Sequence, residues 1–403
     1  MKKILVADDS EQLRTMLETV LSQWGYRVET AGDGDEALKK IKNWMPDLVI
    51  TDIMMPGKHG FSVLQQVKSG VRTKSVKVIV FTGKVFEAER IKAAELGADA
   101  FITKNSSMEV LREAVESLLG GDDSVSVEFF GTRGSIPAVG REYEGYGGNT
   151  PCVAVRAGGK LLIFDAGTGM RDLGTELAGQ GSPVSASIFI THAHWDHIQG
   201  FPFFIPAYDP ENEFAVFGPR AMDRSFEETF RGQFDPNYFP VPFEGLKAKM
   251  GFQDLTEGSF SFGGIRISTV YLNHPGMTLG FRVETGGRSV CYITDNEIDP
   301  GLRADTHQGF DLGKLVSFVK SADICIIDAQ YTDEEYETKR GWGHSSVSSV
   351  LKLGESAEVS RLVLFHHDPS HTDSIIDSIV SSAKSEYGFS VEAAREKSVI
   401  KSG

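Results

Sequence analysis

One stretch of the chain gathers side chains that bind transition metals. Residues 191–200 read THAHWDHIQG and place His192, His194, Asp196 and His197 within six positions. Neutral imidazole and carboxylate suit zinc, manganese or iron, and the spacing lets His192 and His194 turn toward one ion. Asp196 and His197 then point toward a second ion. The alternative is a solvated loop that happens to be rich in histidine, and this density of ligand types disfavours it.

Three more residues of these types occur later, each directly after an apolar run. His274 follows ISTVYLN, Asp295 follows SVCYIT and His366 follows RLVLF, just as the stretch above follows SIFI. Such runs predict buried strands, and loops held at strand ends are where a fold usually keeps its chemistry. A lone histidine after a strand is more often a structural hydrogen-bonder than a ligand. Three such residues in series indicate further ligands for a centre of two ions.

Asp165 ends another apolar run, LLIFD, and a glycine-rich turn follows it. A carboxylate in this place can accept a hydrogen bond from a metal-bound histidine and so orient the ring. It can equally begin an Asx turn before Gly167. The sequence leaves both interpretations open.

The composition limits the class of protein. With 403 residues, 40% of them apolar and 24% charged, the chain is expected to form two or three soluble domains. No apolar run approaches the roughly 20 residues of a membrane-spanning helix. The start MKKILVADDS is not a secretory signal, so a cytoplasmic protein without a membrane partner is expected. Cys152, Cys291 and Cys325 lie in apolar segments without CxxC spacing and are expected to be reduced core residues.

The charge of the chain is unevenly distributed. The net charge is -15, yet residues 1–121 hold 17 basic and 17 acidic residues, so the acidic excess lies beyond residue 121. A protein that grips a long polyanion needs basic surface that releases counterions. DNA and tRNA are therefore not expected as substrates, whereas a small anion held by metal ions is compatible with this charge.

The first 120 residues alternate strand and helix patterns five times. This alternation predicts an α/β fold with a doubly wound, five-stranded parallel sheet, whose functional crevice lies at the carboxyl ends of the strands. Polar residues stand at those ends, namely Asp8, Asp9, Asp52, Thr82 and Lys104. Three carboxylates at one sheet edge need a cation, and oxygen ligands of this kind suit Mg²⁺. Asp52 is then free as a phosphoryl acceptor.

In these features residues 1–120 resemble a response-regulator receiver domain of flavodoxin-like fold, with the acceptor in DIMMPG. The resemblance implies that a histidine kinase is the partner and donates a phosphoryl group to Asp52. It also implies a set of supporting residues: Asp8, Asp9, Asp52 and the backbone of Met54 around Mg²⁺, and Thr82, Phe101 and Lys104 as switch and phosphoryl contacts.

The junction that follows reads LLGGDDSVSV. Gly120 and Gly121 are expected to end the last helix, and the short polar run predicts a linker. The expected organisation is a receiver domain at residues 1–120, a linker at 121–126 and a second domain at 127–403.

From Val125 the pattern changes to short strands punctuated by glycine, which favours a layered α/β fold. The HxHxDH motif, His274 ahead of GFR, Asp295 in YITDNE and the late His366 make residues 125–403 resemble the αββα metallo-β-lactamase fold. The similarity is greatest to its phosphodiesterase branch, which includes RNase Z and cyclic phosphodiesterases. It implies two divalent ions, zinc or manganese with iron as a third candidate. The implied ligands are His192, His194 and His274 for one ion, Asp196, His197 and His366 for the other, and Asp295 between them.

The same branch carries a His-Ser motif before the last ligand, and GWGHSSVSSV supplies His344 and Ser345. Since His344 is not needed as a ligand, it can protonate a leaving alkoxide as general acid, because imidazole titrates near neutral pH. The expected catalytic residues are His344, Asp196 and Asp295. Alternatively, His344 begins a helix beside Ser345, which is a reasonable N-cap.

Four histidines remain outside this assignment. His367 is an alternative to His366 as ligand or a substrate contact, and His371 is a candidate for binding a phosphate oxygen. His59 and His307 are expected to be ordinary surface residues.

The interval between His197 and His274 departs from RNase Z, because it contains no Gly/Lys-rich arm for holding tRNA. It is instead rich in aromatic residues and proline, as in GFPFFIPAYDP. These residues either form an apolar wall suited to a nucleobase or another flat group, or form a cap packed on the core.

The leading hypothesis is a phosphorylation-regulated, dinuclear metal phosphodiesterase that hydrolyses a small phosphodiester, with a cyclic nucleotide as the first candidate. The alternatives are a lactonase or thioesterase on the same metal site, and a two-component signalling module without turnover. The sequence is compatible with a homodimer and does not determine the oligomeric state.

Overall fold

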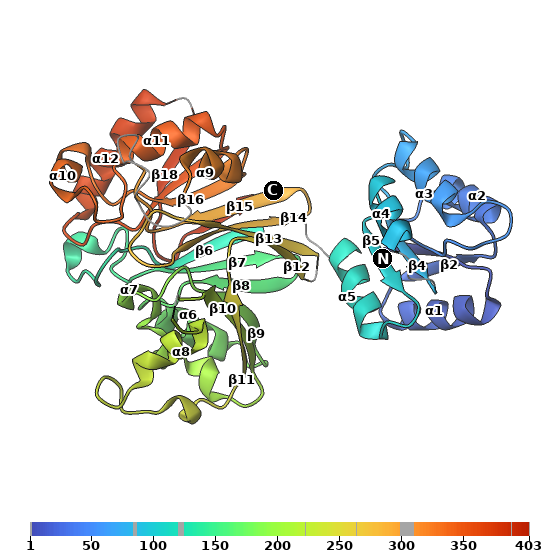
Figure 1. Ribbon diagram of the computed structural model, residues 1–403, viewed down its shortest axis with the longest axis horizontal. Helices are drawn as coiled ribbons and strands as arrows, with labels where there is room; N and C mark the ends of the chain where they lie inside the picture. The colour runs from blue at the N-terminus through green and yellow to red at the C-terminus, as the bar shows by residue number, and fades with distance from the viewer. Residues whose placement is uncertain are drawn as a thin grey trace. The chain divides into compact units, whose positions relative to one another are not determined.

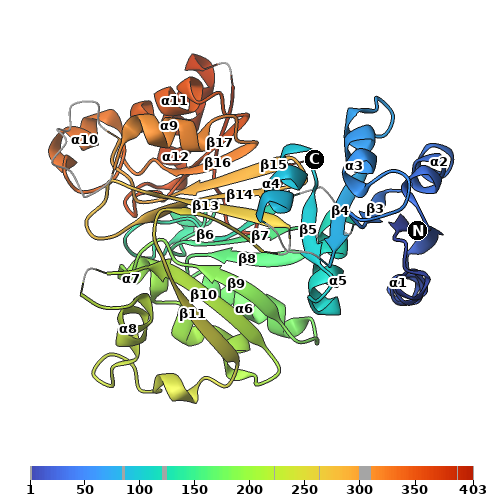
Figure 2. The ribbon, with the colours of Figure 1, turned by 45° about the vertical axis from the view of Figure 1, so that its right-hand side comes forward.

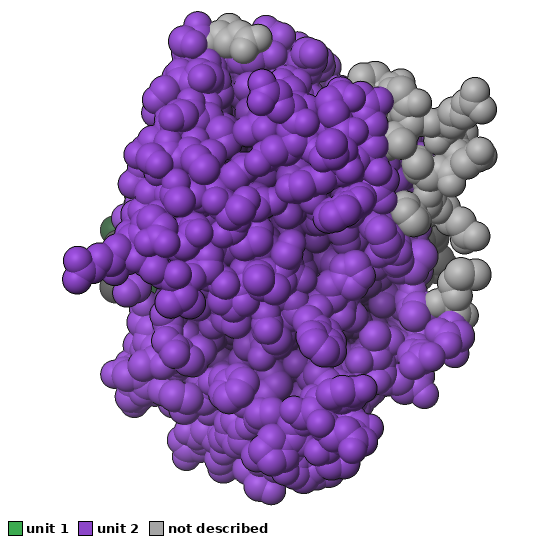
Figure 3. Space-filling view, turned by 90° about the vertical axis from the view of Figure 1, so that its left-hand side faces the viewer, with its two compact units in different colours: residues 1–121 green, residues 122–403 purple. Residues whose placement is uncertain are grey.

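The chain divides into two compact units, residues 1–121 and 122–403, which Figure 3 colours green and purple, and each unit is considered by itself (Figures 1 and 3). The computed structural model describes residues 2–83, 87–119, 125–221, 223–262, 264–298, 310–387 and 389–402. Within these ranges, every helix is too short or too polar to cross a membrane.

The first unit is a five-stranded parallel sheet in the order β2-β1-β3-β4-β5. The strands are β1 (Lys3–Ala7), β2 (Arg27–Ala31), β3 (Leu48–Thr51), β4 (Lys77–Thr82) and β5 (Ala100–Thr103). The helices are α1 (Glu11–Gln23), α2 (Gly34–Trp44), α3 (Gly60–Ser69), α4 (Glu87–Glu95) and α5 (Met108–Leu119). Short apolar runs such as ILVA and LVIT form strands that are buried on both faces of the sheet. The side chains of the two faces belong to two separate core clusters. The predicted doubly wound fold is confirmed.

The second unit contains two seven-stranded sheets. The first runs β11-β10-β9-β8-β7-β6-β19, that is β6 (Val125–Gly131), β7 (Cys152–Ala157), β8 (Lys160–Phe164), β9 (Ser185–Phe189), β10 (Glu213–Pro219), β11 (Lys249–Leu255) and β19 (Val399–Ser402). The second runs from β12 to β18 in sequence order: β12 (Gly258–Phe262), β13 (Ile265–Tyr271), β14 (Leu279–Thr285), β15 (Arg288–Ile293), β16 (Ile324–Asp328), β17 (Arg361–Phe365) and β18 (Ser390–Ala393).

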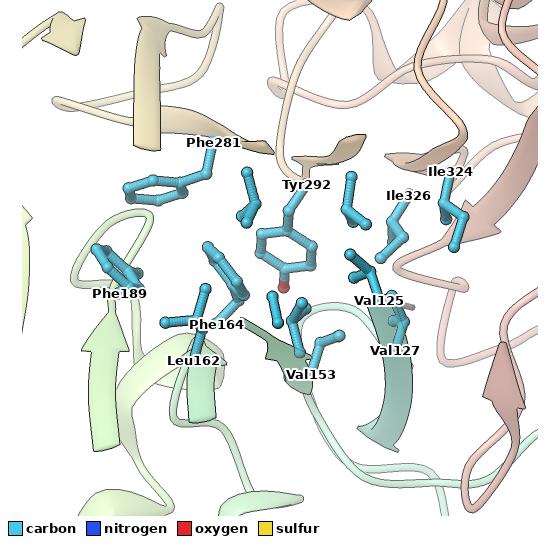
Figure 4. Packing of buried hydrophobic residues seen from close by; sticks show 14 of the residues in the cluster. Val125, Val127, Val153, Leu162, Phe164, Phe189, Phe281, Tyr292, Ile324 and Ile326 are labelled. Carbon is cyan, nitrogen blue, oxygen red and sulfur yellow. The ribbon is translucent and has the colours of Figure 1, made fainter. Parts of the chain in front are cut away.

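The two sheets pack face to face, and helices cover their outer faces (Figures 1 and 2). The layer between them is one apolar cluster, in which Phe281, Tyr292 and Ile326 of one sheet face Phe164, Phe189 and Val127 of the other (Figure 4). Helices α6 (Met170–Gly179) and α8 (Phe226–Arg231) close one side, and α9 (Leu312–Val319), α11 (Val347–Ser356) and α12 (Asp373–Glu386) the other. The predicted αββα layering is confirmed.

The aromatic interval between His197 and His274 belongs mostly to the core. Six of its phenylalanines are buried in the cluster beneath α6 and α8: Phe201, Phe204, Phe214, Phe226, Phe230 and Phe234. Of the two interpretations of this interval, the packed cap therefore holds for these residues. Cys152, Cys291 and Cys325 are free and buried, as predicted.

The predicted linker is too long at its carboxyl end. Val125 and Ser126 lie in β6, where Ser126 pairs with Arg156 of β7 and with Lys401 of β19. Val125 is buried and Ser126 is half-buried, and this alternation continues along the start of β6, as in a strand with one face on the core. The predicted helix end at Gly120 and Gly121 lies outside the described residues.

Candidate metal centre

The strand ends of the second unit carry the chemistry-bearing residues, as the sequence predicts. His192 and His194 follow β9, and the short helix α7 (Trp195–Ile198) then places Asp196 and His197. His274, Asp295 and His366 follow β13, β15 and β17. Three residues at such ends adopt left-handed backbone conformations that residues other than glycine adopt rarely: Asp165 (φ 58°), Asp295 (φ 54°) and His366 (φ 59°). Strain of this kind persists where the surrounding structure fixes a side chain.

Seven of these side chains converge in two groups. The ligand atoms of each group lie within 4.8 Å of one another, and the groups are His192, His194 and His274, and Asp196, His197, Asp295 and His366. Asp295 lies between the groups. Its Oδ2 is 3.6 Å from Nε2 of both His192 and His274, and its Oδ1 is 3.2 Å from Nε2 of both His197 and His366. This division is the one that the family resemblance implies.

The donor atoms fit two divalent cations. Nε2 of His192 and Nε2 of His197 are buried without a hydrogen-bond partner, which is costly unless another group satisfies them. Burial lowers the pKa of His274 to about 4, so its ring is the neutral imidazole that a metal requires. Burial also disfavours charge on His197, yet Asp196 and Asp295 hold its pKa well above the usual value. The second group therefore attracts positive charge, which a cation would supply.

The other ring nitrogens of these histidines have fixed partners. His197 Nδ1 donates to Asp165 Oδ2 at 2.8 Å, His274 Nδ1 to the Gly343 carbonyl at 2.8 Å, and His366 Nδ1 to Gln330 Oε1 at 3.1 Å. Such bonds select the tautomer whose Nε2 faces the metal. For Asp165 the geometry matches the first of the two interpretations, orientation of a metal-bound histidine.

His344 lies beside the two groups without belonging to the predicted ligand set. One ligand atom of His344 lies within 4.8 Å of those of His274 and Asp295, and its Nδ1 is 2.8 Å from Asp328 Oδ2. Burial opposes its protonation, but the carboxylates of Asp328, Asp295 and Asp196 together outweigh burial and raise the pKa of His344 to about 9. These carboxylates therefore favour the protonated imidazole.

The alternative prediction, that a helix begins at His344 with Ser345 as its N-cap, is wrong. Helix α11 begins at Val347, and its N-cap is Ser346, whose side chain accepts from Ser349 N. Ser345 instead donates to the Asn296 carbonyl and accepts from Ile298 N.

The neighbouring histidines have structural partners. His367 Nε2 donates to the Ala394 carbonyl at 3.0 Å, so it does not replace His366 in the ligand groups. His371 Nε2 donates to the Glu335 carboxylate at 2.9 Å, so this nitrogen is not available to the phosphate oxygen for which His371 was a candidate. His59 is exposed at the start of α3, as expected, and His307 lies outside the described residues.

The first unit has a different centre at the carboxyl ends of β1, β3 and β5. Carboxylate oxygens of Asp8, Asp9 and Asp52 lie within 4.8 Å of one another, and Lys104 Nζ is 2.7 Å from Asp8 Oδ2 and 2.6 Å from Asp52 Oδ2. Burial disfavours charge on Lys104, but these two carboxylates raise its pKa above the usual value. This oxygen-rich pocket fits Mg²⁺.

The remaining receiver residues differ in burial. Thr82 is buried at the end of β4, Phe101 is half-buried in β5, and Met54, two residues after Asp52, is exposed.

Comparison with protein families assigns a family to each of the two units. A response regulator receiver domain matches residues 4–116, and a beta-lactamase superfamily domain matches residues 161–367, half of the chain. The chain belongs to the beta-lactamase superfamily. Its first unit is a response regulator receiver domain, which implies a cognate histidine kinase in two-component signalling. The chain thus joins a receiver domain to a domain of the metallo-β-lactamase fold.

Relatives of the receiver domain include transcriptional regulators. The chain is 37% identical over 139 residues to the probable transcriptional regulator ycf27 of Cyanophora paradoxa, covering 34% of this chain and 57% of the relative. It is 38% identical over 118 residues to the alkaline phosphatase synthesis transcriptional regulatory protein PhoP of Bacillus subtilis, covering 29% and 48%. The chain spans about half the length of these curated relatives.

Solved structures resemble the beta-lactamase superfamily domain in fold. The metallo-beta-lactamase fold protein YhfI of Bacillus subtilis aligns with a TM-score of 0.52 and 17% identity, over 70% of this chain and all of YhfI (100%). A diphosphatase of the PhnP family aligns with a TM-score of 0.50 and 15% identity, over 68% of this chain and 97% of that protein.

Two residues of the beta-lactamase superfamily domain escaped the sequence analysis. Asp328 ends the apolar run ICIID, the same signal that pointed to Asp165, and could have been found by it. Ser135 donates its backbone N–H to Asp196 Oδ2 at 2.9 Å. No residue-type signal marks a backbone donor, so only the folded chain reveals this contact.

Proposed function

We propose that this chain is a metal-dependent phosphodiesterase that hydrolyses a small phosphodiester, with a cyclic nucleotide as the first candidate, under control of its receiver domain. The observation that carries the proposal is the position of the His344–Asp328 pair directly beside two ligand groups joined by Asp295. This arrangement supplies a proton donor next to a site for two cations.

The seven ligands would hold two divalent ions, zinc or manganese with iron as a third candidate. Ions bound there would lower the pKa of water and stabilise charge on phosphoryl oxygens. Asp295 joins the two groups, and the Ser135 N–H, at 2.9 Å, fixes Asp196 Oδ2, which lies 3.3 Å from His366 Nε2. The protein thereby holds the reacting groups in one geometry before substrate arrives.

His344 is the proposed general acid. Its Nδ1 is committed to Asp328, which leaves Nε2 to give a proton to the leaving oxygen. An alkoxide leaving group needs this proton far more than a thiolate does. The pair therefore favours an oxygen ester over a thioester.

The surroundings of the centre favour a substrate with a flat apolar part. His194 is exposed, and its neighbour Trp195 is 73% exposed. Ile136 (60% exposed) follows Ser135, which contacts Asp196, and Trp342 (61% exposed) precedes Gly343, which contacts His274. Large apolar side chains exposed next to a polar centre are typical of binding sites for aromatic groups. A nucleobase attached to the phosphodiester fits this chemistry.

The acidic excess of residues beyond 121 also supports a small substrate rather than a nucleic acid. For the receiver domain we propose phosphoryl transfer from a histidine kinase to Asp52, with Mg²⁺ held by Asp8 and Asp9.

A substrate panel on the purified, metal-loaded chain tests the proposal. We expect hydrolysis of bis-p-nitrophenyl phosphate and of cyclic AMP, and little activity on lactones or thioesters. Activity on lactones alone would contradict the phosphodiesterase assignment, and no turnover on any substrate would favour a signalling module without catalysis. The Asp295→Asn variant is the control for contaminating hydrolases, because it removes the group shared by both ligand sets.

A further inference from the structure

A buried carboxylate outside the ligand set holds the loop that leads into His344. Glu297 is 3% exposed and lies two residues after Asp295. Its Oε1 accepts from Tyr336 Oη and from Gly341 N, both at 2.7 Å, and its Oε2 accepts from Gly343 N at 2.9 Å. Both carboxylate oxygens are therefore used to fix a loop that is more than forty residues away in sequence.

The loop held by Glu297 contacts the first ligand group. The Gly343 carbonyl accepts from His274 Nδ1 at 2.8 Å, and His344 is the next residue. Gly343 has a φ of 86°, and a Cβ there would lie 2.3 Å from His274 Nδ1. Only glycine allows this close approach, so the loop and the His274 ring are fitted to each other.

The backbone of Glu297 holds His274 from the other side. Glu297 N donates to the Asn273 carbonyl at 2.9 Å, and Asn273 Nδ2 donates to the Glu297 carbonyl at 2.8 Å. Asn273 N donates in turn to Asn296 Oδ1 at 2.8 Å. The residue before His274 is thus tied to the segment that carries Asp295, while the His274 ring is tied to the loop that the Glu297 side chain fixes.

We propose that Glu297 is a positioning residue that sets His274 for its metal ion and His344 for proton transfer. The part that concerns His344 rests on the proposed function, whereas the part that concerns His274 requires only that the centre binds metal. Replacing the carboxylate by an amide turns one acceptor into a donor. That donor would face either the N–H of Gly343 or the donors at Oε1, so the loop and its carbonyl must shift away from His274.

Metal titration distinguishes positioning from a general contribution to stability. The full-length chain is stripped of metal and titrated with zinc in competition with a chromophoric chelator. We expect Glu297→Gln to lower the affinity for one of the two zinc ions about 10- to 100-fold, while the other ion binds as in the wild type. The rate constant kcat on cyclic AMP, whose alkoxide leaving group needs a proton, should fall while KM changes little. Wild-type affinity for both ions would overturn the proposal.

Asp323→Asn is the matched control. The Asp323 carboxylate accepts from Ser289 N at 2.8 Å and from Ser289 Oγ at 3.1 Å, at the amino end of β15 and far along the strand from Asp295. The control should lower the melting temperature of the metal-free chain as Glu297→Gln does, yet bind both ions normally. Equal loss of metal affinity in both variants would show that Glu297 acts only through stability.

Tyr336→Phe is a milder substitution that tests the same proposal if Glu297→Gln does not fold. Tyr336→Phe removes one donor and leaves both backbone donors to Glu297. It should lower the affinity for the same ion by a smaller factor. Unchanged binding of both ions would overturn the proposal. Because zinc affinity is measured without substrate, a difference in affinity without phosphodiester turnover would support positioning and refute the proposed activity.

Discussion

The receiver pocket and the metal centre of the second unit lie at the same place in their folds, the carboxyl ends of strands, yet they balance charge differently. In the receiver, Lys104 contacts Asp8 and Asp52 and supplies the positive charge from the chain. In the second unit the pKa of His197 is raised by surrounding carboxylates, and unpartnered imidazole nitrogens face inward. A pocket that carries its own cation can exchange a hard ion such as Mg²⁺. A pocket with buried nitrogen donors is built to retain a transition metal.

Metal removal and replacement should separate the two centres most clearly. We expect a strong chelator to reduce phosphodiester hydrolysis to the background rate, and zinc or manganese to restore it. Mg²⁺ alone should not restore hydrolysis, because imidazole ligands do not suit it. The same Mg²⁺ should support labelling of Asp52 by acetyl phosphate. Full hydrolytic activity with Mg²⁺ alone would remove the distinction between the centres.

Loss of His344 should have the next largest effect. We expect His344→Ala to lower kcat about 10²- to 10⁴-fold, the usual contribution of a general acid, with metal content unchanged. Asp328→Asn should lower kcat in the same direction, because Asp328 holds the imidazole through Nδ1. His59→Ala, at an exposed receiver position, is the control. Wild-type rates for His344→Ala on every phosphodiester tried would exclude His344 as the acid.

Phosphorylation should couple the two centres. We expect beryllofluoride, which mimics a phosphoryl group on Asp52, to change the turnover of the wild-type chain by about 5- to 150-fold, the usual range of allosteric coupling. Turnover of Asp52→Asn should not respond. Equal wild-type rates with and without beryllofluoride would show that the receiver does not regulate the centre.

The smallest expected effect concerns the exposed aromatic side chain beside His194. Trp195→Ala should raise KM for cyclic AMP about tenfold, because stacking on a base contributes about 1–3 kcal/mol. The value of kcat should stay within about twofold of the wild type. For dimethyl phosphate, which has no ring, KM should not change. An equal rise in KM for both substrates would show that Trp195 stabilises the metal centre and does not stack on the base.

The sequence predicts the fold because the fold depends on local patterns, and the same patterns place the candidate ligands at strand ends. Apolar runs specify strands. The strands β13, β15 and β17 run in the same direction, so the residues that follow them reach the same edge of the sheet, which is why His274 and Asp295 could be found. His366 and His367 are adjacent, and only the folded strand end shows that one faces the centre while the other bonds to Ala394.

Residues that act through long-range hydrogen bonds are less visible in the sequence. Glu297 reaches Gly343 across the fold, and neither residue type nor spacing marks the pair. Val125 and Ser126, the two residues of β6 that were assigned to the linker, are hard to predict for a similar reason. Their pairing partner is β19, which is far away in sequence.

The central claim is that the two ligand groups joined by Asp295 form one dinuclear phosphodiesterase centre. Its most direct test is the rate of bis-p-nitrophenyl phosphate hydrolysis, measured while metal-free protein receives zinc or manganese in known molar ratio. The account predicts that the rate rises until two ions are bound per chain and then stays constant. A rate that is already maximal at one ion per chain, or no turnover with both ions bound, would contradict it.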